Sequence, residues 1–269
     1  MIAVVDYQKG NLKSVERGLI AAGGEALITA DASEIAKADA IVLPGVGAFA
    51  DAAATMCELG QMEVIRERVR AGVPFLGICL GEHLMFEHGV EGAPEGNPAC
   101  GLGLLPGTVV AMPRCDAQGK TFKVPHVGWN TIEMPSCNGG VTVPPCGEGG
   151  GNAVLSSGGA GGGAARSSAA KRGLFEHGAF PDSAPQPGSD LAFACPLFDG
   201  IAPGEYFYFT HSYIAPTGFH TIAETTHSVR FTSAVQFGER AFGVQFHPEK
   251  SSDAGARVLA NFVAIAARG

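Results

Sequence analysis

The sequence predicts an α/β fold with a mostly parallel central sheet, flanking helices and an antiparallel extension. In the first hundred residues, short apolar runs alternate with stretches whose apolar residues recur at helical spacing. Such alternation implies parallel strands joined by right-handed crossovers. In the second half, short strand-like runs follow one another at hairpin-like intervals, which indicates antiparallel pairing. Ligands of such sheets bind at the carboxyl ends of the parallel strands.

The first half should contain three buried strands, each followed by a helix. Asn11 can cap the first of these helices, and Gly23-Gly24 can end it. The expected elements are a strand over 2–6, a helix containing Leu12, Val15, Leu19 and Ile20, a strand over 40–43, a helix containing Met62, Ile65 and Val69, a strand over 73–76 and a helix over 80–88.

The second half should consist of short strands and a closing helix. The strands are expected over 109–112, 122–124, 206–210, 221–225 and 233–237, and the helix over 253–267. Residues 136–190 are rich in Gly, Ser, Ala and Pro without hydrophobic periodicity. Such a segment cannot bury enough apolar surface to offset its ordering entropy. We therefore predict one domain over 1–269, interrupted by a Gly-rich flexible insertion at about 136–190, which a loop tolerates at small cost.

The stretch Gly77-Ile78-Cys79-Leu80-Gly81 is the most informative part of the chain. Its glycines permit a sharp turn between the expected strand and the expected helix. This is the geometry of a nucleophile elbow, with a thiol in place of a serine hydroxyl. The N-terminal end of a helix favours a thiolate. Cys79 is therefore a candidate nucleophile, although a cysteine in a Gly-rich turn is often structural.

A second stretch, from Ala241 to Glu249, supplies a base. Its apolar residues run up to His247 and indicate a strand that ends at Pro248. Because strand side chains alternate between faces, His247 and Glu249 are expected on the same side. With Cys79 they supply the nucleophile, the base and the group that orients the base in covalent catalysis. The alternative is a core histidine beside a surface glutamate, which the elbow in the same chain disfavours.

These two stretches, 77–81 and Gly243 to Ser251, resemble the two signatures of class I (triad-type) glutamine amidotransferases. Four further segments resemble those of the glutaminase subunit of imidazole glycerol phosphate synthase: Asp6 to Val15, Pro44 to Phe49, Pro125 to Asn130, and Phe209 to Tyr213. They span the chain in the order of that family. The first and third of them discriminate this subunit from other amidotransferases.

The resemblance implies hydrolysis of the glutamine side-chain amide by Cys79, His247 and Glu249, without a metal or an organic cofactor. It implies an oxyanion hole of backbone N–H groups, for which Leu80, Val46 and Gly47 are candidates. Candidate substrate-binding residues are His83, His211 and Ser212.

The resemblance also implies a partner. Ammonia is expected to pass to a separate (β/α)8 cyclase subunit, which makes imidazole glycerol phosphate and an aminoimidazole carboxamide ribotide in histidine synthesis. Candidates for the interface of this heterodimer are Asn11, Trp129 and Lys250. Their alternative roles are a plain helix cap, a core aromatic and a solvated charge, respectively.

One position departs from the pattern. After Gly81 the family commonly has Met-Gln, and this chain has Glu82 and His83. A neutral imidazole at position 83 can donate or accept one hydrogen bond to a substrate, but not both as a glutamine amide does. A carboxylate at position 82, beside the thiol, disfavours the thiolate. A weakened or non-catalytic regulatory paralogue therefore stays an alternative. The others are an amidotransferase feeding a different synthase and a stand-alone cysteine γ-glutamyl hydrolase.

Composition excludes several classes of partner. The chain has 269 residues, 46% of them hydrophobic, and a net charge of -8, which argues against binding nucleic acid or an anionic membrane. We expect no secretory leader and no membrane span. Seven scattered cysteines without a leader suggest a reduced, cytoplasmic protein. The gap between Cys137 and Cys146 is too long for paired metal ligands, so no metal site is expected there.

Overall fold

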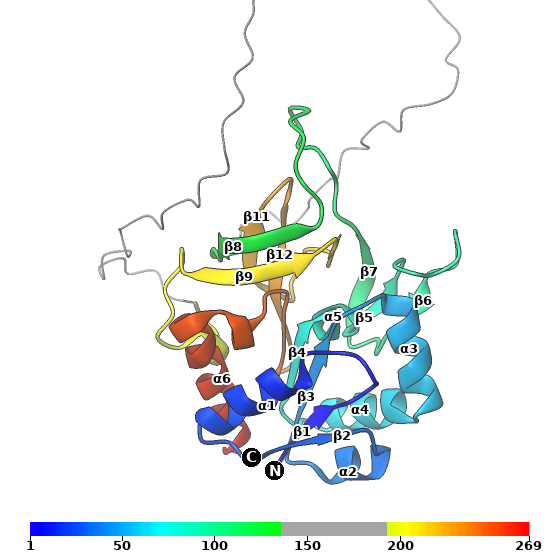
Figure 1. Cartoon of the computed structure of the whole chain (residues 1–269), viewed down its shortest axis with the longest axis vertical. Helices are drawn as coiled ribbons and strands as arrows, with labels where there is room; N and C mark the ends of the chain where they lie inside the picture. The colour runs from blue at the N-terminus through cyan, green and yellow to red at the C-terminus, as the bar shows by residue number, and fades with distance from the viewer. Residues whose placement is uncertain (136–192, 269) are drawn as a thin grey trace, which may run out of the picture.

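The computed structural model describes residues 1–135 and 193–268 (Figure 1). The predicted insertion at about 136–190 lies outside the described residues, as do Cys137 and Cys146.

A seven-stranded sheet forms the centre of the described chain, in the order β11-β12-β13-β4-β3-β1-β2. The five strands from β13 to β2 are parallel, and β12 and β11 extend the sheet in antiparallel fashion. This arrangement confirms the predicted fold class. The strands are β1 (Ile2–Val5), β2 (Ala26–Thr29), β3 (Ala40–Gly45), β4 (Phe75–Cys79), β11 (Thr221–Thr226), β12 (Arg230–Phe237) and β13 (Ala241–Val244).

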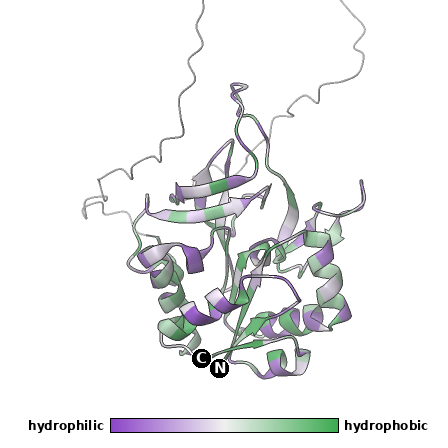
Figure 2. Cartoon of the chain, viewed as in Figure 1, coloured by the Kyte–Doolittle hydropathy of each residue, from purple (hydrophilic) through white to green (hydrophobic). Residues whose placement is uncertain are grey.

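Helices cover both faces of this sheet (Figure 1). Alternate residues of the parallel strands enter two separate cores, so that Val4 packs with one set of helices and Val5 with the other. Most of β1, β3 and β4 is therefore apolar on both faces, as Figure 2 shows. One face packs α1 (Leu12–Ala21) and α6 (Ser252–Ala266), and the other packs α2 (Ala32–Lys37), α3 (Phe49–Glu58) and α4 (Gln61–Arg70).

Two smaller sheets complete the architecture. The ribbon of β8 (His126–Thr131) and β9 (Tyr206–His211) crosses above the carboxyl ends of the central strands (Figure 1). The other sheet has the order β10-β7-β5-β6. Its strands are β5 (Phe86–Gly89), β6 (Ala99–Cys100), β7 (Leu105–Ala111) and β10 (Tyr213–Ile214); the short helices of the fold are α5 (Leu80–His83), η1 (Pro196–Phe198) and η2 (Pro248–Lys250).

Several sequence predictions need correction. The helix expected over 80–88 ends at His83, because Phe86–Gly89 pairs with β7 as a strand. Residues 122–124 form no strand, and β8 forms just after them instead. The helices α2 and α3 and the strand β2 were not predicted. The strands expected over 206–210, 221–225 and 233–237, and the closing helix, are confirmed, with each end within three residues of its predicted position.

Two further predictions concern the redox state of the cysteines and the absence of a membrane-spanning segment. Cys57, Cys79, Cys100 and Cys195 are free thiols, whereas Cys115 is disulfide-bonded, so the expectation that the cysteines are reduced is wrong for Cys115. Among the described helices, none has both the length and the apolar character needed to cross a membrane.

Candidate active site

Cys79 lies at the apex of a strand-turn-helix elbow, where β4 ends and α5 begins. Its backbone has φ 54° and ψ -106°, a strained conformation for a residue with a side chain. A Cβ atom on Gly81 would lie 1.8 Å from the Leu43 carbonyl oxygen, and one on Gly77 would lie 2.5 Å from the carbonyl oxygen of Gly81. Both flanking glycines are therefore required, as the sequence predicted. The helix has only four residues, so its dipole supports a thiolate less than predicted.

His247 and Glu249 form a buried pair above this elbow. His247 Nδ1 donates a hydrogen bond to Glu249 Oε1 at 2.9 Å, and both side chains are almost fully buried. The predicted contact exists, but its predicted cause is wrong. The strand β13 already ends at Val244, and the 3-10 helix η2 brings Glu249 back toward the imidazole.

Interactions of His247 with its neighbours favour the imidazolium. Burial lowers the pKa of His247, but the neighbouring Cys79 sulfur and the Glu249 carboxylate outweigh burial and raise that pKa to about 9. The other ring nitrogen, Nε2, is buried and has no hydrogen-bond partner among the described residues. A nitrogen in this situation is available to exchange a proton with a reacting group.

A buried amide that was not predicted as a site residue contacts the thiol. Gln245 Nε2 donates to Cys79 Sγ at 3.7 Å, while Gln245 Oε1 lies 2.7 Å from His83 Nε2. Both Gln245 and His83 are buried. Burial lowers the pKa of His83 to about 4, against the opposing hydrogen bond to Gln245, so this imidazole is neutral at pH 7. The signal in the sequence was the position of Gln245 two residues before His247.

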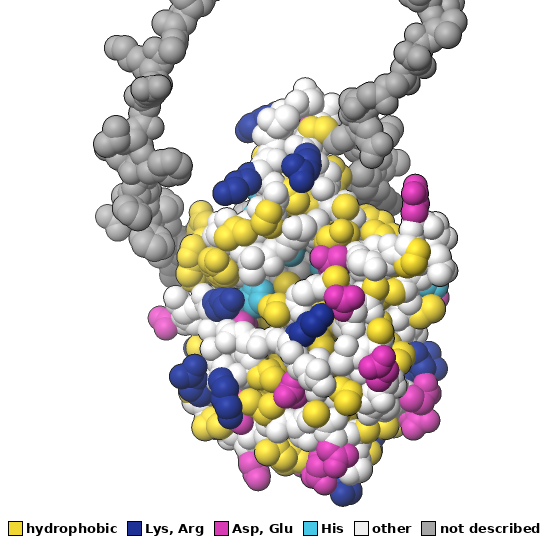
Figure 3. Space-filling model, turned by 45° about the vertical axis from the view of Figure 1, so that its right-hand side comes forward, with side chains coloured by type: hydrophobic (Ala, Val, Ile, Leu, Met, Phe, Trp, Pro, Cys, Tyr) yellow, Lys and Arg dark blue, Asp and Glu magenta, His cyan; other side chains and the backbone are white. Residues whose placement is uncertain are grey.

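Cys79 opens into a cavity of about 400 Å³. Figure 3 shows a hollow on this part of the surface, with histidine atoms visible inside it. Every residue predicted for the oxyanion hole or for substrate binding contributes to the lining of the cavity, although these residues come from three separate segments. The lining comprises Val46, Gly47, Ala48, Cys79, Leu80, His83, Glu91, Pro125, Thr210, His211, Ser212 and Tyr213.

The segment after β3 lies beside the elbow, because Gly45 pairs with Cys79 across the parallel strands. A Cβ atom on Gly45 would lie 2.3 Å from the Tyr7 hydroxyl, so only glycine fits there. Gly47 has φ +100°, which also favours glycine. Tyr7 was not predicted as a site residue. It is buried, its hydroxyl has no hydrogen-bond partner among the described residues, and burial followed by the charge of Cys79 raises its pKa.

His211 uses both ring nitrogens within the protein. Its Nδ1 donates to the Tyr213 carbonyl oxygen at 2.8 Å, and its Nε2 lies 3.0 Å from His126 Nδ1. Burial lowers the pKa of both histidines. A hydrogen bond from His211 to a substrate would therefore have to replace one of these contacts.

The three candidate interface residues lie on the same side of the molecule as the β8-β9 ribbon and η2. Trp129 is 43% exposed, which excludes the core-aromatic alternative. The centroid of the Trp129 ring lies 6.1 Å from the centroid of the Tyr208 ring. Lys250 Nζ lies over the same Tyr208 ring, 5.9 Å from its centroid. Asn11 occupies the N-cap position of α1 but makes no side-chain cap hydrogen bond, contrary to the prediction. Its Nδ2 instead donates to Glu249 Oε1 at 3.5 Å.

Glu82 points into the core rather than toward solvent. It is fully buried, and neither carboxyl oxygen has a hydrogen-bond partner among the described residues. Burial, followed by the charge of Cys79, raises the pKa of Glu82 well above its usual value. Burial therefore favours the neutral carboxyl, which opposes the negative charge that the sequence predicted beside the thiol.

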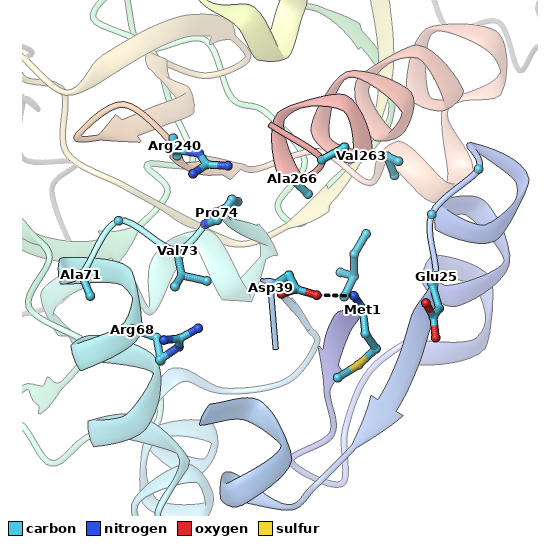
Figure 4. A pocket seen from close by; sticks show the side chains of 15 residues that line it. Met1, Glu25, Asp39, Arg68, Ala71, Val73, Pro74, Arg240, Val263 and Ala266 are labelled. Carbon is cyan, nitrogen blue, oxygen red and sulfur yellow. Dashed lines mark hydrogen bonds and ion pairs between the residues drawn. The ribbon is translucent and has the colours of Figure 1, made fainter. Parts of the chain in front are cut away.

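A larger cavity, of about 590 Å³, lies at the opposite end of the sheet (Figure 4). There the Met1 ammonium bonds to Asp39 at 2.6 Å, and Arg68 and Arg240 contribute to the lining. It opens at the amino ends of the parallel strands, whereas ligands of such sheets bind at the carboxyl ends. We therefore assign the candidate active site to the smaller cavity, which contains Cys79.

Fold and site together define a class I glutamine amidotransferase. The model of the family described as "Glutamine amidotransferase class-I" matches residues 3–139 and 174–266. Solved structures support the fold alone: a glutamine amidotransferase superposes with a TM-score of 0.58 at 16% identity, covering 99% of this chain and 98% of its own. PurLQS from Thermotoga maritima superposes with a TM-score of 0.56 at 15% identity, covering 98% and 97%.

Closer relatives specify the branch of this class. "Imidazole glycerol phosphate synthase subunit HisH" of Moorella thermoacetica is 36% identical over 263 residues, covering 97% of this chain and 93% of its own. The protein of the same name from Syntrophotalea carbinolica is 33% identical, covering 97% and 98%. The chain belongs to this family of class I glutamine amidotransferases, the HisH subunits of imidazole glycerol phosphate synthase.

Proposed function

We propose that this chain is the glutaminase subunit of imidazole glycerol phosphate synthase and that Cys79, His247 and Glu249 are its catalytic residues. The observation that carries this assignment is the elbow that presents Cys79 to a cavity beside the buried pair of His247 and Glu249. A nucleophile, a base and a group that orients the base are the parts that covalent amide hydrolysis needs.

The reaction follows from these positions. Cys79 Sγ attacks the carboxamide carbon of glutamine, and the carbonyl oxygen becomes an oxyanion. Backbone N–H groups of Leu80 and of the segment Val46-Gly47 stabilise this oxyanion. His247 Nε2 gives its proton to the leaving nitrogen, so ammonia departs and a thioester remains. His247 then takes a proton from water, which attacks the thioester and releases glutamate.

Glu249 holds the tautomer of the base. Because its carboxylate accepts the proton on Nδ1, the proton exchanged in the reaction is carried by Nε2. The raised pKa of His247 keeps the imidazolium available as the acid for the leaving nitrogen.

The ammonia is used by a partner in this proposal. A (β/α)8 cyclase subunit docks on the side of the molecule that carries Asn11, Trp129 and Lys250. It combines ammonia with its nucleotide substrate to give imidazole glycerol phosphate and an aminoimidazole carboxamide ribotide. The half-exposed Trp129 on β8 supports this choice of surface, because large aromatic side chains are enriched at protein interfaces.

The test is glutamate release from glutamine by the purified chain alone, with the cyclase subunit, and with the cyclase and its nucleotide ligand. Cys79→Ala should abolish release, whereas Cys57→Ala, at an exposed free thiol, should leave it unchanged. We expect release to rise with the partner and its ligand. Full activity without the partner would favour a stand-alone γ-glutamyl hydrolase. No release from any mixture, despite complex formation, would favour a non-catalytic subunit.

A further inference from the structure

Three buried side chains, those of His83, Gln245 and Cys79, are joined by hydrogen bonds. His83 and Cys79 belong to the elbow, whereas Gln245 follows the neighbouring strand β13. Val244 pairs with Ile78 across β13 and β4, so the next residues, Gln245 and Cys79, leave the sheet at the same level. The Gln245 amide bridges Cys79 Sγ at 3.7 Å and His83 Nε2 at 2.7 Å. Gln245 and His83 are buried, at 0% and 3% exposure.

The chemistry of the two groups fixes the direction of both hydrogen bonds. Gln245 Oε1 can only accept, so the proton between it and the imidazole is on His83 Nε2. A neutral imidazole with its proton on Nε2 has a bare Nδ1, and the low pKa of His83, about 4, excludes a second proton at neutral pH. With Oε1 thus occupied, the amide presents its NH₂ end, a donor, to Cys79 Sγ.

We propose that Gln245 is a positioning residue that stabilises the Cys79 thiolate through an N–H···S hydrogen bond, and that His83 holds the Gln245 amide in that orientation. This inference deepens the proposed function, since it concerns the same nucleophile. An amide turned the other way would present Oε1 to the sulfur and repel the thiolate. His83, in place of the glutamine common in relatives, thus acts on the nucleophile through Gln245 rather than on the substrate.

The pH at which Cys79 ionises reports on this contact. The titratable side chains that interact with Cys79 are His247, Glu82 and Tyr7, and all three remain in variants of Gln245 and His83. The measurement is the rate of iodoacetamide alkylation of Cys79 against pH, followed by peptide mass spectrometry. Cys57, an exposed thiol, serves as a reactivity reference in the same sample, and Cys195, a buried thiol, reports unfolding if it becomes reactive.

Four variants test the proposal. Gln245→Met keeps the side-chain size but removes the donor, and Gln245→Glu replaces the NH₂ with an oxygen. Both should move the alkylation midpoint of Cys79 upward by about one pH unit, a tenfold loss of thiolate at fixed pH. His83→Leu removes the group that orients the amide and should shift the midpoint in the same direction. His83→Gln restores a donor for Gln245 Oε1 and should keep the parental midpoint.

Unchanged midpoints in both Gln245 variants, with Cys195 still protected, would overturn the inference. If the Gln245 variants unfold, the His83 pair decides: equal midpoints for His83→Leu and His83→Gln would also overturn it. The readout needs no turnover. A parent chain that releases no glutamate, yet shows the expected midpoint shifts, would remove the proposed function and leave this inference standing.

Discussion

Replacing Glu82 with methionine should stabilise the protein, by an amount that grows with pH. The Glu82 carboxyl is fully buried, and neither of its oxygens has a partner among the described residues. Burial of an unpaired polar group costs about 1–3 kcal/mol. Methionine has a similar length, and a Cβ atom placed on Gly243 would lie within 2.8 Å of Glu82 Cγ, Met85 Sδ and Val235 Cγ2, so apolar side chains lie close to this position.

A second cost of Glu82 comes from its protonation. Burial raises its folded-state pKa well above the ordinary value of 4.5, so the folded protein keeps a proton that the unfolded chain loses above that pH. The stability contributed by this difference is fully present below pH 4.5 and is lost as pH rises toward the folded-state pKa. The loss is about 1.4 kcal/mol per pH unit while the folded carboxyl stays protonated.

Urea denaturation of the parent, Glu82→Met and Glu82→Gln at pH 5, 6 and 7 separates the two costs. Glutamine keeps the unpaired polar atoms but cannot titrate. At pH 5 we expect the methionine variant to exceed the parent by about 1–3 kcal/mol and the glutamine variant to match it approximately. Between pH 5 and pH 7 both variants should gain stability relative to the parent, because the folded parent holds a proton that its unfolded chain loses in this range. A difference that does not change with pH would refute the raised pKa, and a destabilised methionine variant would refute the unpaired burial.

Three further predictions concern the elbow, the base and the exposed tryptophan. Gly81→Ala should cost about 4 kcal/mol or more, or prevent folding, because its Cβ would meet the Leu43 carbonyl oxygen; urea denaturation measures this. Glu249→Gln should lower the pKa of His247 from about 9, which an NMR titration follows. In the parent, the raised pKa of His247 contributes folding stability that is fully present below pH 6.5 and is lost as pH rises through about 9. Glu249→Gln should reduce this contribution. Trp129→Ala should change the unfolding free energy by no more than about 0.5 kcal/mol while weakening cyclase binding at least about tenfold, by calorimetry.

The elbow was predictable because its cause is local. Gly77 and Gly81 are the residues that a sharp turn around Cys79 requires, and the atoms they would otherwise meet belong to the elbow and the neighbouring strand. The parallel strands were predictable for a similar reason, since strands buried on both faces are short continuous apolar runs.

The failures have a common cause in pairing between distant segments. The residues of β5 have helical character locally, but strand pairing with β7 overrides it. Residues 122–124 look like a strand, yet the partner strand β9 pairs with 126–131, so that His126 faces His211. The residue pattern of a single segment does not show which distant segment will pair with it. The contact between Gln245 and Cys79 belongs to the same category, because it joins two strands that are far apart in the chain.

The two departures from the common pattern, Glu82 and His83, act differently once their surroundings are known. As residue types, both suggested a weakened site. Burial moves their pKa values in opposite directions, up for Glu82 and down to about 4 for His83, and each change favours the neutral form. Burial therefore opposes a charge on either side chain beside the sulfur. His247 then remains the cationic group that faces Cys79, and the cost of the unpaired Glu82 carboxyl falls on folding stability.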